Sequence, residues 1–171
     1  MFDPTVFENL KVAIENQIYD LDNLSGKIKI TNRIDRLDMS VLSREFAIQF
    51  SLLDRSDISA EIRLVAPLRE LAAEIMEVPG ENPGCILILR FYIQIINISM
   101  QCEIIQDIMQ QIWSLDIAPT QTLRFVYGRE ESIYMNTIEL EFNRKINEDH
   151  MGDIPNLIDH VLRTLSELRN I

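Results

Sequence analysis

The chain has few of the residues that build nucleotide-binding or nucleophilic sites. Its 171 residues include only five glycines, which form neither a G-x-G-x-x-G turn nor a phosphate-binding P-loop. The two cysteines, Cys85 and Cys102, fall in apolar patterns that are typical of free buried thiols. Any Ser–His–Asp or Cys–His mechanism would need one of the two histidines, His150 or His160. The sequence predicts no catalytic motif, and we expect no cofactor.

Cationic side chains are also scarce. The chain has 16 Lys and Arg against 27 Asp and Glu, a net charge of −11 that repels nucleic-acid phosphates and anionic lipid surfaces. We therefore expect no nucleic acid and no membrane among its partners. The first residues carry no cationic and apolar leader, and the longest apolar run, 85–97, contains Arg90, Gln94 and Asn97. A membrane-spanning helix needs about 20 apolar residues, so we expect a cytoplasmic location.

The composition is that of a folded globular protein, with 47% hydrophobic and 25% charged residues. At this length one core can bury roughly 70% of the surface that the unfolded chain exposes. The strongest break in the sequence is the Pro- and Gly-rich segment 79–84, and the segments on either side are small for independent cores. We expect residues 1–171 to form a single domain with a loop at 79–84.

Hydrophobic periodicity predicts four helices and about six strands. Helical spacing marks residues 4–23, 67–77, 99–115 and 154–168. Period-two alternation marks residues 27–34, 45–52, 58–64, 85–97, 123–127 and 134–142. This order predicts an α+β fold, with a largely antiparallel or mixed sheet and the helices packed mainly on one of its faces.

Several positions make this prediction more specific. Asp3 and Asp153 are expected as helix N-caps, with Pro4 in the first turn of its helix. In the first strand, the alternation places Ile28 and Ile34 on the same face.

The run 85–97 is the expected central strand because it is long and rich in β-branched and aromatic residues. One of its faces is wholly apolar and carries Cys85, Leu87, Leu89, Phe91, Ile93 and Ile95. The other face mixes Arg90, Tyr92 and Gln94 with isoleucines at 86, 88, 96 and 98. Isoleucines on a face that the helices do not cover indicate that something else covers it.

We therefore interpret the protein as a non-enzymatic protein-interaction module that forms a homodimer. Arg and Tyr are enriched in protein interfaces, which supports the second sheet face as the contact surface. The predicted interface consists of Ile86, Ile88, Arg90, Tyr92, Gln94 and Arg124. Glu139 and Glu141 fall on the same face, where cross-strand pairing with Arg63, Arg90 or Arg124 is expected.

An alternative function uses the acidic segment 148–153. Carboxylates and an imidazole in this segment, from Asp149, His150 and Asp153, are the best candidate metal ligands, and His160 follows in the next helix. The segment lacks the regular ligand alternation and central glycine of a helix–loop–helix calcium site. This alternative is a metal-dependent enzyme or a small-ligand-binding regulatory domain.

Overall fold

The computed structural model describes residues 5–114, 118–129 and 131–171. Its elements, in chain order, are α1 (Val6–Asn23), β1 (Ile28–Asp38), β2 (Ser43–Leu52), β3 (Arg55–Ala66), α2 (Leu68–Ile75), β4 (Ile86–Ile95), α3 (Ile98–Trp113), β5 (Thr120–Arg124), β6 (Tyr134–Glu141), the 3-10 helix η1 (Glu148–Asp153) and α4 (Ile154–Leu168). The six strands form one sheet in the order β1-β2-β3-β4-β6-β5, and every neighbouring pair is antiparallel. The predicted α+β fold is confirmed, and the strand pairing is antiparallel rather than mixed.

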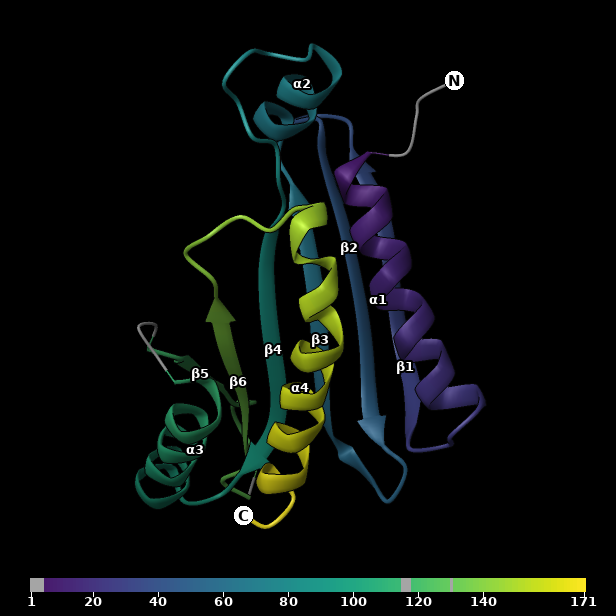
Figure 1. The fold of residues 1–171 in the computed structure, drawn as a ribbon. Helices are drawn as coiled ribbons and strands as arrows, with labels where there is room; N and C mark the ends of the chain where they lie inside the picture. The colour runs from purple at the N-terminus through teal and green to yellow at the C-terminus, as the bar shows by residue number, and fades with distance from the viewer. Residues whose placement is uncertain (1–4, 115–117, 130) are drawn as a thin grey trace.

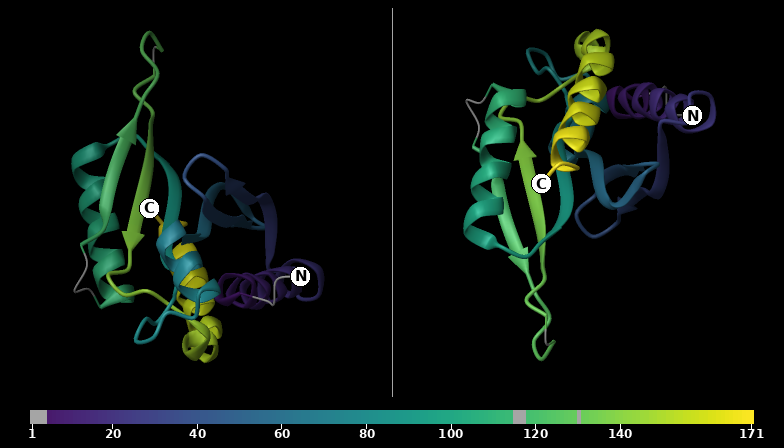
Figure 2. Two further views of the ribbon diagram at one scale, coloured as in Figure 1. Left: turned by 90° about the horizontal axis from the view of Figure 1, so that it is seen from above. Right: turned by 90° about the horizontal axis from the view of Figure 1, so that it is seen from below.

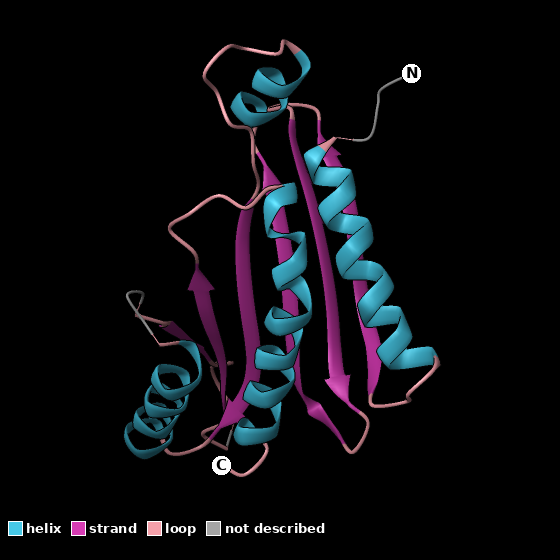
Figure 3. Cartoon of the chain, in the orientation of Figure 1, coloured by secondary structure: helices cyan, strands magenta, loops and turns pink. Residues whose placement is uncertain are grey.

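Two long helices form a second layer over one face of the sheet. α1 and α4 lie side by side across the strands (Figures 1 and 3), and their apolar stripes are buried against the strands. In α4 the buried stripe is Ile154, Ile158, Val161, Leu165 and Leu168, as the helical spacing predicted. The core lies between this helical layer and the apolar faces of the central strands, which include Phe46, Phe50, Ile62, Leu89 and Phe91.

α3 covers the β5–β6 side of the same sheet face (Figure 2). The Gln121 amide of β5 donates to the backbone carbonyl of Cys102 in α3, and Asn136 of β6 donates to the Gln121 side chain. At the other end of α3, the indole N–H of Trp113 donates to the Thr164 hydroxyl of α4. These contacts place α3 in the same layer as α4.

α2 differs from the other three α-helices because none of its residues is buried. It lies beyond one end of the sheet (Figure 1), and its Leu68 and Ile75 side chains are exposed, whereas Leu71 packs against the core from a partly buried position. Its Glu70 side chain accepts from the Gly84 backbone N–H and pairs with Lys145, which holds the 79–84 loop against it.

The helix starts differ in part from the sequence prediction. The Thr5 hydroxyl accepts from the backbone N–H of Glu8 and caps α1, whereas the predicted cap Asp3 and Pro4 lie outside the described residues. Asp153 occupies the N-cap position of α4, but its side chain makes no capping hydrogen bond. The preceding turn η1 carries a capping box instead, so α4 begins as a continuation of that turn.

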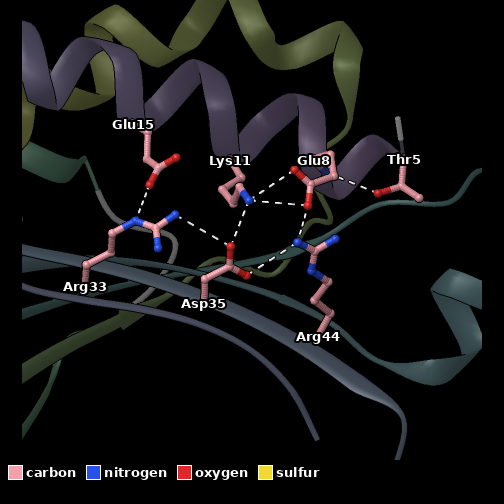
Figure 4. Close-up of polar contacts among 7 residues, drawn as sticks. All are labelled: Thr5, Glu8, Lys11, Glu15, Arg33, Asp35 and Arg44. Atoms are coloured by element: carbon pink, nitrogen blue, oxygen red, sulfur yellow. Dashed lines mark hydrogen bonds and ion pairs between the residues drawn. The ribbon is translucent and has the colours of Figure 1, made fainter. Parts of the chain in front are cut away.

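A bulge in β1 turns its charged residues toward α1. The pairing register with β2 shifts between Ile30 and Asn32, so side chains after the bulge exchange faces. Arg33 then pairs with Glu15, and Asp35 accepts from the Lys11 ammonium at 2.8 Å (Figure 4). The bulge also moves Ile34 to the face opposite that of Ile28, so the prediction that these two residues share a face is wrong.

Candidate functional site: the open face of the sheet

We call the second sheet face the open face. It carries Ile86, Ile88, Arg90, Tyr92 and Gln94 of β4, together with the residues paired with them across the other strands. Arg124 of β5 pairs with Met135 of β6, which in turn pairs with Gln94. The fold therefore brings all six residues of the predicted interface onto one surface. No helix within the described parts of the chain packs on this face (Figures 1 and 2).

An alternating arginine–glutamate ladder crosses the open face. The Arg36 guanidinium lies 2.7 Å from Glu45, whose carboxylate also contacts Arg63. On the far side, Arg90 donates to Glu139 at 2.6 Å, which confirms one of the predicted cross-strand pairs. From β1 to β6, the ladder consists of Arg36, Glu45, Arg63, Glu61, Arg90 and Glu139.

Glu61 is the buried centre of this ladder. Its side chain is only 4% exposed, and it lies 3.0 Å from Arg63 and 3.7 Å from Arg90. Loss of hydration raises the pKa of Glu61, although Arg90 and the Tyr92 hydroxyl act in the opposite direction. Burial likewise lowers the pKa of Arg63. Burial is the largest cause of both shifts.

Three apolar residues of the open face form a half-buried patch on the two central strands. Val65 of β3 pairs with Ile86 of β4, and Ile88 lies two residues further along β4. The prediction that Ile96 and Ile98 also belong to this face is wrong, because Ile96 follows the end of β4 and Ile98 begins α3. The chain turns there because Asn97 caps α3 by accepting from the Met100 N–H at 3.1 Å.

The charges on the open face balance, unlike those of the whole chain. Its strand-paired cations are Lys29, Arg36, Arg63, Arg90 and Arg124, and its strand-paired acids are Asp38, Glu45, Glu61, Glu139 and Glu141. Five cations thus oppose five acids, in a chain whose net charge is −11. The excess negative charge lies elsewhere on the molecule, so the open face is an electrically neutral surface.

The alternative metal ligands lie in η1. His150 Nδ1 accepts the backbone N–H of Asn147 at 3.0 Å, and the Asn147 side chain accepts from the Asp149 N–H. His160 Nδ1 lies 2.7 Å from the Asn156 carbonyl, and its ring packs beside Trp113. In the described ranges no group of three or more His, Cys, Asp or Glu side chains is close enough to hold a metal ion. Both histidines are used in local structural contacts.

The sequence analysis did not identify Glu61 as the centre of the open face. Its position in a period-two strand placed it on the polar side, but its burial depends on lying between Gln49 and Arg90 in the sheet. A search for an acidic residue beside one arginine on its own strand and a second arginine on the neighbouring strand would have found it, once the strand order was known.

The chain matches no protein-family model, no curated protein and no solved structure. Among its described helices, none is both long enough and apolar enough to cross a membrane. The surfaces that the fold exposes are therefore the basis for a functional proposal.

Proposed function

We propose that the protein is a non-enzymatic interaction module that forms a homodimer, with the open face of one copy packed against the open face of the other. The observation that carries this proposal is the neutrality of the open face in a strongly acidic chain. A second copy meets no net repulsion at this surface, whereas the rest of the molecule carries the net charge of −11. In a dimer with two-fold symmetry, the arginine–glutamate ladder of one copy faces the same ladder of the other copy, which runs in the opposite direction.

The size of the open face suits a dimer. Six strands about 4.8 Å apart and about eight residues long span roughly 29 by 26 Å, or about 750 Å². A standard protein interface buries about 800 Å² on each partner. Two twisted sheets can pack face to face with their strands rotated by about 30°, so most of the surface is usable.

The side chains at the centre of the face fit the composition of an interface. Tyr92 and Arg90 are half-buried on the central strand, and Ile86 and Ile88 continue the same row. Tyr and Arg are the residue types that most often dominate binding energy, surrounded by a polar rim. Gln94 and Arg124, both exposed, lie toward the edge of the face.

Sedimentation velocity over a micromolar concentration series tests this proposal. Wild-type protein is expected to sediment as a dimer, and Tyr92→Ala should raise the dimer dissociation constant roughly tenfold or more. The matched control is Tyr127→Ala, which removes a tyrosine that is 96% exposed on the β5–β6 hairpin. A wild-type monomer throughout the series, or a dimer unaffected by Tyr92→Ala, would refute the homodimer.

A further inference from the structure

The two edge strands of the sheet, β1 and β5, differ in how they are protected. An edge strand presents a row of backbone N–H and C=O groups with which a further strand can pair. Adjacent residues of an antiparallel strand direct these groups to opposite sides. Every second residue of β1 and β5 therefore faces outward from the sheet with its backbone groups.

The β1 edge is protected against strand addition. The Asp22 carboxylate of α1 accepts from the outward backbone N–H of Ile30 at 3.0 Å, and the Asn32 side chain accepts from the N–H of Arg33 at 2.9 Å. The strand also has a bulge between Ile30 and Asn32, and five of its eleven residues are charged. Bulges and charges are common means of blocking an edge.

The β5 edge has fewer of these protections. Its register with β6 is unbroken over all five residues, and Arg124 is its only charged residue. α3 contacts this strand through the Gln121 side chain, which donates to the Cys102 carbonyl at 2.9 Å. Short length is the main feature that protects β5.

The outward backbone groups of β5 belong to Gln121 and Leu123. The Phe142 N–H donates to the Leu87 carbonyl at 3.3 Å, so β6 residues in phase with Phe142 bond β4, and the intervening ones bond β5. Those intervening residues pair with Thr120, Thr122 and Arg124. Gln121 and Leu123 therefore direct their N–H and C=O groups away from β6. In the described ranges no group accepts from either N–H.

The side chains of β5 indicate the composition of a strand that could pair with it. Thr122 and Arg124 are exposed, and Leu123 is half-buried on the side of α3. Cross-strand pairing favours Thr or Val opposite a threonine and a carboxylate opposite an arginine. Apolar surface continues beyond the strand, since Phe125 is 64% and Val126 is 59% exposed.

We propose that the β5 edge binds an extended segment of a partner protein, which adds a seventh, antiparallel strand to the sheet. The segment carries an acidic residue opposite Arg124, an apolar residue opposite Leu123 and Thr or Val opposite Thr122. Main-chain hydrogen bonds hold such a segment, and alternate side chains select it. A second copy fits this edge less well, because a five-residue strand spans only about 17 Å and buries far less than the roughly 800 Å² per partner of a standard interface.

Fluorescence anisotropy with a labelled peptide that contains Glu-Val-Thr-Val-Thr tests the proposal on the full-length protein. The peptide is expected to bind with a dissociation constant below about 1 mM. With its glutamate opposite Arg124, the amides of its two valines face β5 and those of its threonines face away. N-methylation of both valine nitrogens should therefore weaken binding at least about tenfold, whereas the matched control, N-methylation of both threonine nitrogens, should change it less than about threefold.

Amide hydrogen exchange locates the bound peptide. The peptide should slow exchange at the Gln121 and Leu123 amides roughly tenfold and leave unchanged the Asp35 and Leu37 amides, which face outward from β1 by the same alternation. Replacing the peptide's glutamate by lysine should weaken binding roughly fivefold. Tyr92→Ala is expected to leave peptide binding unchanged, because Tyr92 belongs to the open face rather than to this edge.

Four results would overturn the proposal. They are the absence of peptide binding up to about 1 mM, equal effects of the two methylation patterns, equal binding of the glutamate and lysine peptides, and protection of the β1 amides in place of those of β5. None of these results depends on whether the open faces of two copies pair, so the two proposals can fail separately.

Discussion

The two charges of the buried Glu61–Arg63 pair are predicted to have unequal effects on stability. Removing the acid with Glu61→Gln leaves Arg63 paired with Glu45 and Arg90 paired with Glu139. The free energy of unfolding should then change by less than about 1 kcal/mol, or increase, because the cost of burying a carboxylate is removed. Removing the base with Arg63→Met instead leaves Glu61 buried with one cation of the ladder, Arg90, 3.7 Å away, and with the Tyr92 hydroxyl. That change should destabilise the fold by about 3 kcal/mol.

The pH dependence has a definite sign. Because the pKa of Glu61 is raised in the folded chain, the folded state binds a proton more tightly than the unfolded state does. Between the unfolded pKa of about 4.3 and the raised folded value, this group lowers the free energy of unfolding as the pH increases. The difference between wild type and Glu61→Gln should therefore shift in favour of the variant across this window.

Urea unfolding followed by far-UV circular dichroism measures these effects, with all variants at one protein concentration because the proposed dimerisation would add to stability. Arg36→Met is the matched control, since Arg36 belongs to the same ladder but its side chain is 64% exposed. It should cost less than about 1 kcal/mol. A loss of several kcal/mol in Glu61→Gln, equal to that of Arg63→Met, would refute the conclusion that burial dominates this pair.

Three further predictions concern the rest of the fold. Burial would raise the pKa of Asp35, but neighbouring cations lower it; its stabilising effect is therefore lost as pH falls through the folded pKa, and Asp35→Asn should show a shallower acid decline in urea titrations. In Gly84→Ala the new Cβ would lie 2.8 Å from the Ile146 carbonyl oxygen, so calorimetry should detect a loss of about 1–3 kcal/mol that Gly152→Ala does not show. Burial raises the pKa of Cys85 to about 12, and iodoacetamide labelling at mildly alkaline pH should be no faster than unfolding.

The periodic elements of the fold could be predicted from the sequence because their burial patterns are simple. β4 alternates without interruption from Ile86 to Ile95, and the apolar stripe of α4 repeats every three or four residues. Each pattern reflects burial on one face of a single element, which is a local property of the sequence. The six predicted interface residues also lie on one face for this reason, since five of them belong to β4.

Features that depend on pairing between strands could not be predicted. The β1 bulge has no distinct sequence signal at Thr31, yet it moves every later side chain to the opposite face. The burial of Glu61 requires the order β2-β3-β4, which places arginines of its own and the neighbouring strand beside it. The position of α2 beyond the end of the sheet depends on the path of the 79–84 loop, which local periodicity does not encode.

Hydroxyl-radical footprinting at dilute and concentrated protein tests the proposed dimer surface most directly. If the open faces pack together, oxidation of Tyr92 should fall as the protein associates, while oxidation of Tyr127 on the exposed hairpin should stay constant. Oxidation of Met76, which is 72% exposed at the end of α2, should also stay constant. Tyr92 oxidation that does not depend on concentration, or protection of Met76 in its place, would contradict the assignment of the open face as the surface through which two copies pair.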